Sequence, residues 1–157
     1  MPTMKEAAFE FLAHKRFAVT GVSRKPKDHG SNTVFKRLRD RGYEVFAVNP
    51  NADSVEGARS YHNLKSIPGG VDAVVIATAP DKAEGTMREC AELGIKHVWM
   101  HRSYGPGSVC AAATALGRKH GITVIDGGCP LMFDPVADVG HKIMRFFCAG
   151  HIPKSVS

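Results

Sequence analysis

The sequence predicts an α/β fold: a Rossmann-like parallel sheet of about five strands with helices on both faces, in a three-layer α/β/α arrangement. The first observation is that short apolar runs alternate along the chain with segments of helical periodicity. The second is that the run from Val71 to Thr78 is apolar except for Asp72, as in strands buried on both faces of a parallel sheet. The third is that glycine, proline or asparagine follows several of the apolar runs.

Each element follows from its local pattern. A helix is expected at 4–13, where apolar residues recur at helical spacing. The remaining expected elements are strands at 17–22, 44–48, 71–78, 97–100 and 122–125, and helices at 31–41, 81–93, 108–120 and 135–147. We expect Asp81 and Ser108 to cap two helices, and Pro135 to lie in the first turn of the last one. The segment 52–68 is expected to be a loop, with Ser60-Tyr61 as a short extended piece.

Composition limits the possible classes of protein. The 157 residues predict one domain over 1–150 and a frayed tail over 151–157. The formal net charge of +6 favours an anionic partner, but the basic residues follow no nucleic-acid-binding pattern. No apolar run is long enough to cross a bilayer, and the N-terminus lacks a signal-peptide pattern. Four scattered cysteines favour reduced thiols, so we expect a soluble protein in the cytoplasm, bound neither to membrane nor to nucleic acid.

The junction after the first predicted strand has the pattern of an anion site. Gly21 ends an apolar run, and Ser31-Asn32 begin a helical segment after a polar loop. Glycine lets backbone N–H groups approach a ligand closely, and a helix N-terminus offers unpaired donors with a partial positive charge. The loop also carries the basic residues Arg24, Lys25 and Lys27. This junction therefore predicts a site for a phosphate-bearing small molecule.

Two common nucleotide sites fit poorly. The dinucleotide fingerprint G-x-G-x-x-G lacks its second glycine, and Asn49-Pro50-Asn51 stand where a ribose-binding carboxylate is expected. An NADP site could use Arg24 or Lys25, but we expect no second domain to bind a substrate. The Walker pattern G-x-x-x-x-G-K-[ST] is also absent.

Several segments in this order resemble the stand-alone CoA-binding domain family, which is related to the CoA-binding N-terminal domain of the succinyl-CoA synthetase α subunit. The resemblance covers about residues 15 to 131. It is carried by Val19-Thr20-Gly21-Val22-Ser23, by the loop to Ser31-Asn32, by Tyr43 to Asn51, by Val71 to Ile76, and by Asp126-Gly127-Gly128-Cys129-Pro130. The synthetase's phosphorylated histidine lies in another domain, which this chain lacks, so that activity is not implied.

The resemblance implies a ligand, coenzyme A or an acyl-CoA, and a set of residues around it. Gly21, Val22 and Ser23 would cradle the pyrophosphate together with Ser31 and Asn32. The adenosine would be bordered by Asn49 and Pro50, and the opposite side of the crevice would be Thr78, Ala79 and Pro80. Arg24 and Lys25 would either meet a ribose phosphate or remain in solvent.

Catalysis is not the favoured interpretation. Cys129 and His101 follow predicted strands and are the candidates for a nucleophile and a base, but a packed thiol and a solvated imidazole are the simpler alternatives. His62, His101, Cys129 and His141 lack the spacing of a zinc site. The sequence thus predicts a non-catalytic CoA-binding or regulatory module.

Two rival functions and the oligomeric state stay open. One rival is an NADP- or CoA-dependent reductase or acyl-transfer enzyme that uses the same crevice, and the other is a protein-interaction module with a lapsed nucleotide site. Met144, Phe146 and Phe147 on the last helix either pack within the chain or form a homodimer face. Trp99 is expected in the core or the crevice wall.

Overall fold

The computed structural model describes residues 1–25, 30–103 and 105–156. Within these ranges the strands are β1 (Arg16–Thr20), β2 (Glu44–Val48), β3 (Ser54–Val55), β4 (Ala58–Tyr61), β5 (Ala73–Ile76), β6 (His97–Met100) and β7 (Thr123–Asp126). The helices are α1 (Met4–Leu12), α2 (Gly30–Asp40), α3 (Pro80–Glu92), α4 (Ala111–Lys119) and α5 (Val139–Phe147), with 3₁₀ turns η1 (Leu64–Ser66), η2 (Pro130–Met132) and η3 (Ala149–His151).

The sheet confirms the predicted fold class. Its strand order is β3-β4-β2-β1-β5-β6-β7, and every pair is parallel except the β3–β4 hairpin at one edge. The described residues hold seven strands where about five were expected. The two additional strands form the hairpin over 54–61, of which only Ser60-Tyr61 was predicted to be extended. This hairpin was missed because β3 has two residues, too few to show an alternating pattern.

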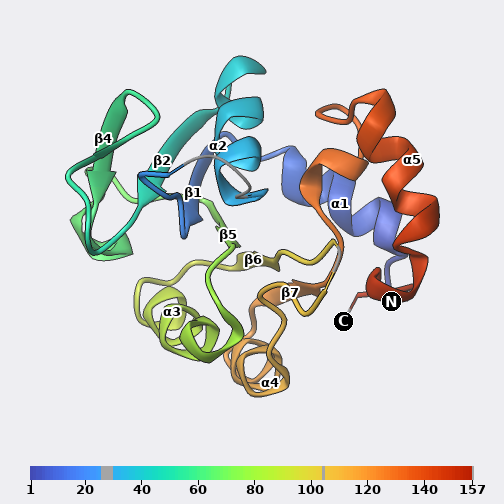
Figure 1. Ribbon diagram of the computed structural model, residues 1–157. Helices are drawn as coiled ribbons and strands as arrows, with labels where there is room; N and C mark the ends of the chain where they lie inside the picture. The colour runs from blue at the N-terminus through green and yellow to red at the C-terminus, as the bar shows by residue number, and fades with distance from the viewer. Residues whose placement is uncertain (26–29, 104, 157) are drawn as a thin grey trace.

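Helices cover both faces of the sheet, as Figure 1 shows: α1, α2 and α5 lie on one face, and α3 and α4 lie on the other. Alternate residues of the strands supply two separate cores. Val19 and Val75 belong to the core beneath α1 and α2, whereas Ala18 and Val74 belong to the core beneath α3 and α4. The central strands are therefore buried on both faces, in agreement with their continuous apolar sequence.

Three helix starts differ from the sequence-based expectation. Pro80 is the first residue of α3, so Asp81 lies within the first turn and does not cap it. Ser108 precedes α4 by three residues, and its hydroxyl donates instead to the Thr78 carbonyl. The last helix begins at Val139, and its cap is Asp138 rather than a turn containing Pro135. In the first two cases a proline and a tertiary hydrogen bond replace the local cap that the sequence suggested.

The last residues pack against the first helix and are not frayed. Thr3 forms a β-bridge with Ser155, the Val156 N–H donates to the Pro2 carbonyl, and the Val156 side chain is buried. Figure 1 accordingly shows the two termini close together. Trp99 lies fully in the core, where it contacts Phe11 edge to face. Nowhere in the described ranges is there a helix with the length and apolarity needed to span a bilayer.

Candidate functional site

The carboxyl ends of β1 and β5 meet where the chain reverses its direction across the sheet, because β1 connects forward to β2 on one side and pairs with β5 on the other. Gly21 follows β1 with φ +76°, and a Cβ there would lie 2.7 Å from the Ala77 carbonyl oxygen. The junction therefore requires glycine both for its backbone conformation and for the close approach of β5. Such a switch point is where open parallel sheets bind ligands.

Polar side chains of α2 hold the loop that follows Gly21. The Asn32 Oδ1 accepts a hydrogen bond from the Ser23 N–H at 2.9 Å, and its Nδ2 donates to the Ser23 carbonyl at 2.8 Å. The Ser31 hydroxyl donates to the Gly21 carbonyl at 2.8 Å. Both side chains are buried. They were predicted as direct ligand contacts, and in the structure they shape the loop by bonding to its backbone.

Asn49 connects β2 to the same loop. Its Nδ2 donates to the Val22 carbonyl at 2.9 Å, and its Oδ1 accepts from the Asn51 N–H at 2.8 Å. A carboxylate at this position would offer no donor to Val22. The asparagine that replaces the usual ribose-binding acid therefore ties the ends of β1 and β2 together.

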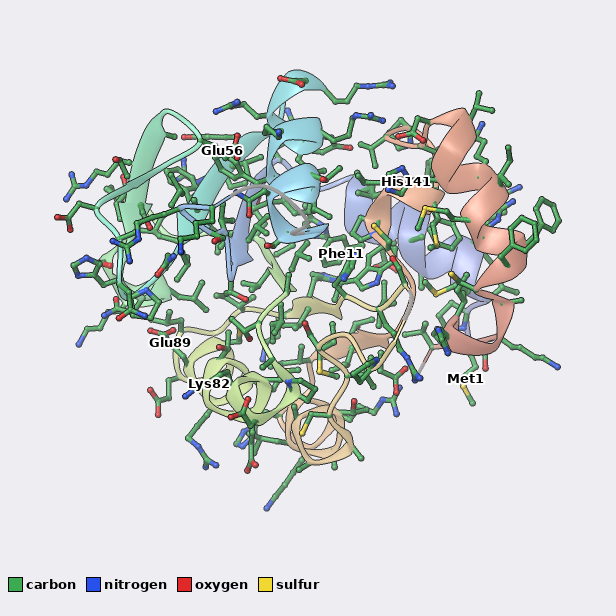
Figure 2. All side chains as sticks on the ribbon, viewed as in Figure 1. Met1, Phe11, Glu56, Lys82, Glu89 and His141 are labelled. Carbon is green, nitrogen blue, oxygen red and sulfur yellow. The ribbon has the colours of Figure 1, made fainter. Side chains whose placement is uncertain are left out.

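A cavity of about 760 Å³ opens at this edge of the sheet. Five of the predicted site residues line it, namely Gly21, Asn49, Pro50, Thr78 and Ala79. The opposite wall comes from α3, which contributes Lys82, Arg88 and Glu89 among others. Figure 2 shows Lys82 and Glu89 on this helix. The volume suits a nucleotide-sized ligand, and the cavity lies at the switch point of the sheet.

Thr78 lines this cavity and also carries a buried polar atom without a partner. Within the described part of the chain its Oγ1 is buried and has no hydrogen-bond partner, whereas its carbonyl accepts from Ser108. A buried hydroxyl without a partner is costly. Pro80, the next predicted residue but one, begins α3 and does not line the cavity.

The remaining predicted residues of the loop lie outside the cavity. The Val22 side chain is fully buried in the core, while Ser23 is half-buried, and Arg24 and Lys25 are exposed. The Lys25 N–H donates to the Ser23 hydroxyl at 3.0 Å. Lys27, the third cation of the predicted basic loop, falls outside the described residues.

His101 lies at the end of β6 beside the first residue of α2. A Cβ built on Gly30 would be 3.3 Å from the His101 Cε1 atom. Burial, followed by the charge of His141, lowers the pKa of the His101 imidazole to about 4. The ring is therefore neutral at pH 7, and a group with this pKa is a weak general base.

Cys129 follows β7 and is packed in the core. Burial raises the pKa of its thiol to about 12, so the reactive thiolate is scarce at neutral pH. This environment favours the packed thiol over the nucleophile. All four cysteines are free thiols.

The four residues weighed as zinc ligands are not brought together as a set. His62 pairs with Asp53 near the hairpin edge, whereas the His141 Nδ1 lies 2.8 Å from the Asp138 carboxylate on α5. Across residues 1–25, 30–103 and 105–156, no group of three or more metal-ligating side chains is arranged around a common point.

Sequence reasoning missed the part of the site that comes from distant segments. Lys82 and Arg88 of α3 face the cavity because α3 follows β5 at the switch point. Their i, i+6 spacing carries no recognisable motif. Glu56 in the hairpin bonds to Asn32 across 24 residues of sequence, and only the three-dimensional structure shows that contact.

Sequence comparison gives the same family as the residue patterns. The model of the CoA binding domain family matches residues 15–135. The uncharacterised protein YneT of Bacillus subtilis is 33% identical over 115 residues, which are 73% of this chain and 82% of that protein. The α subunit of the ADP-forming acetate–CoA ligase II of Pyrococcus furiosus is 37% identical over 89 residues. The match spans 56% of this chain but only 19% of the ligase subunit.

Solved structures share the fold. A hypothetical protein from Pyrococcus horikoshii superposes with a TM-score of 0.75 at 23% identity, covering 96% of this chain and 97% of that one. A conserved hypothetical protein from Pyrococcus furiosus has a TM-score of 0.61 at 29% identity, covering 70% and 90% of the two chains. The family match includes the glycine junction and the strand ends that line the cavity. The chain belongs to the CoA-binding domain family.

Proposed function

We propose that this protein binds coenzyme A or an acyl-CoA through its nucleotide end and acts as a binding or regulatory module without turnover. The observation that carries the proposal is the match of residues 15–135 to the CoA-binding domain family. All residues that line the cavity at the switch point of the sheet lie within this range. The diphosphate would lie at the Gly21 to Ser23 loop and the N-terminus of α2. The adenosine would lie between Asn49-Pro50 and Thr78-Ala79 in the cavity.

The chemistry of the cavity supports a phosphorylated nucleotide. Lys82 lies in the first turn of α3 on the cavity wall, and Asn49 and Asn51 supply uncharged polar groups at the end of β2. A carboxylate at residue 49 would repel a ribose phosphate, and this chain has none there. The absence of turnover is supported by the neutral His101 and the buried Cys129 thiol, neither of which is poised for catalysis at neutral pH.

Thermal unfolding with a panel of ligands tests the proposal, because a ligand that binds only the folded state raises its stability by mass action. CoA and acetyl-CoA at about 100 times their Kd should raise the melting temperature by roughly 5–10 °C. NAD and ATP should have little effect. A rise with NADP alone would favour the reductase alternative, and no rise with any of these ligands would favour a lapsed site.

A matched pair of variants tests whether the CoA diphosphate lies at the loop from Gly21 to Ser23. Ser23→Glu adds a negative charge and bulk at the proposed diphosphate loop, so it should weaken CoA binding by more than about tenfold through charge repulsion. Ser54→Glu adds the same group on an exposed position of β3 and should bind CoA as the original protein does. Equal affinity of the two variants would show that the diphosphate lies elsewhere.

We propose in addition that α5 pairs with a second copy of this chain. Val139, Ile143, Phe146 and Phe147 follow one another at helical spacing and are 75, 52, 77 and 77% exposed. Together they present roughly 500 Å² of apolar surface, at the upper end of what monomers expose and more than half of one partner's share in a standard interface. Replacing Phe146 and Phe147 by serine should convert a dimer to a monomer in sedimentation equilibrium. A monomeric original protein at high micromolar concentration would refute the pairing.

A further inference from the structure

The β3–β4 hairpin has an unfavourable residue at its tip. Glu56 and Gly57 connect the two strands with φ values of +50° and +71°, the pattern of a two-residue type I′ turn. Asparagine or aspartate followed by glycine suits this turn, because an ordinary side chain is strained at positive φ. Glu56 is the only non-glycine residue with positive φ in the described part of the chain. Such an outlier calls for a reason outside the turn.

That reason is visible on α2, where three donors converge on Glu56. The Asn32 Nδ2 donates to Glu56 Oε1 at 3.0 Å, and the Lys36 Nζ lies 3.7 Å from Oε2. One turn further along, the Arg39 Nη1 donates to the Glu56 backbone carbonyl at 2.9 Å. The spacing of four and then three residues places all three donors on one face of the helix. Figure 2 shows Glu56 between the hairpin and α2.

Asn32 connects Glu56 to the proposed diphosphate loop, Gly21 to Ser23. One Asn32 amide hydrogen goes to the Ser23 carbonyl and the other to Glu56, while Oδ1 accepts from the Ser23 N–H. Since a carboxylate only accepts hydrogen bonds, Glu56 favours the single orientation of the amide in which Oδ1 faces Ser23. The Glu56 side chain is 12% exposed, so water competes little for these bonds.

We infer that Glu56 is a positioning residue for the diphosphate loop, because its carboxylate holds Asn32 in the orientation that fixes the backbone of Ser23. The inference rests on the proposed function for its ligand, CoA. A loop fixed before binding loses less conformational freedom when the ligand arrives, so its rigidity increases affinity. The strained turn therefore places the Glu56 carboxylate where it contacts α2.

The substitution Glu56→Asn separates this role from a structural one. Asparagine fits the turn better but is one methylene shorter, so it loses the contact with Asn32. The melting temperature without ligand should stay within about 3 °C of the original, while the Kd for CoA measured by calorimetry should rise about tenfold. Hydrogen exchange at the Ser23 amide should become about tenfold faster, because the bond to Asn32 is less constrained.

Two further variants act as controls. Glu56→Gln keeps an oxygen acceptor for Asn32 and should bind CoA within about threefold of the original protein. Lys36→Met removes only the long ion pair to Glu56 and should likewise have little effect. Rescue by glutamine would show that the hydrogen bond, and not the charge, positions the loop.

The outcomes distinguish this inference from the proposed function. If the original protein binds CoA and Glu56→Asn binds it equally well, the inference is overturned and the proposed function stands. If the original protein binds no CoA, the proposed function fails. The exchange rate of the Ser23 amide then decides alone whether Glu56 fixes the loop, and an unchanged rate in Glu56→Asn refutes it.

Discussion

Two strand ends in this protein carry glycine and lead into a helical turn, and they differ in what lies next to the glycine. After β1, Gly21 approaches β5 and borders the cavity at the switch point. After β7, Gly127 and Gly128 face the chain's own C-terminal segment, since the Gly128 N–H donates to the His151 carbonyl at 3.0 Å. A Cβ on Gly127 would overlap that carbonyl oxygen. Glycine at a strand end thus marks close backbone approach in both places, and the neighbour determines whether a ligand can enter.

Replacing the two glycines should give the largest effects. Gly21→Ala and Gly127→Ala each combine positive φ with overlap of a backbone carbonyl, so each should lower the free energy of unfolding by about 3 kcal/mol or more in urea denaturation. The two variants should differ in ligand response. CoA should stabilise Gly127→Ala as it stabilises the original protein, but Gly21→Ala much less.

A third glycine provides the control. Gly42 has φ +87° and open space around its Cβ position, so Gly42→Ala isolates the cost of positive φ at about 1 kcal/mol. If CoA stabilised Gly21→Ala fully, the cavity at β1 would not be the binding site. If it failed to stabilise Gly127→Ala, the distinction between the two junctions would disappear.

The sequence predicts the strands and helices at these junctions, which depend on local patterns. It does not predict contacts between segments that are distant in the sequence. The strand before Gly21 and the helix after Ser31 follow from the β-branched residues, the glycine and the helical spacing within one stretch of about 25 residues. The family resemblance, confirmed by comparison, rests on the same stretch and three others. By contrast, the contact of Glu56 with Asn32 depends on how the hairpin folds back onto α2.

The C-terminal residues illustrate the same limit. The polar segment 151–157 has no periodicity and was expected to fray, yet Ile152 and Val156 pack against the core, and His151 occupies the space beside Gly127. Similarly, Ser108 has the residue type of a helix cap but bonds to the Thr78 carbonyl on a neighbouring loop. Tertiary partners outcompete local ones in both cases, and a single sequence does not show which partners are near.

The free energy of unfolding should depend on pH through His101, which lies next to Gly30 of α2. The pKa of His101 is about 4 in the folded protein, below its ordinary value of 6.5, so the unfolded chain binds the proton more readily. His101 therefore contributes full stability above pH 6.5, and this contribution falls by roughly 3 kcal/mol as the pH decreases to 4. In urea denaturation at pH 7, 5.5 and 4.5, His101→Gln should remove most of this fall.

Two other groups serve as controls for that titration. Burial, followed by the charge of His14, also lowers the pKa of His97, so His97→Gln should remove a smaller part of the same fall. The backbone hydrogen bond from His141 lowers the pKa of Asp138 to about 2, so the stability from Asp138 is lost only below pH 3.8. A wild-type slope in His101→Gln would show that the imidazole is not buried beside α2.

The smallest expected effect concerns Cys129, which follows the two glycines after β7. Cys129→Ser should leave the affinity for CoA within about twofold of the original, because the thiol lies in the core next to Gly127-Gly128 and not in the cavity.

The accessibility of the Cys129 thiol can be tested by alkylation. Iodoacetamide at pH 8 should label half-buried Cys110 well before Cys129, because the Cys129 pKa of about 12 leaves on the order of one thiolate in 10⁴. Peptide mass spectrometry measures both rates, and urea should make all four cysteines react alike. Labelling of Cys129 as fast as Cys110 in the folded protein would show that the second junction also opens, and Cys129 would return as a candidate nucleophile.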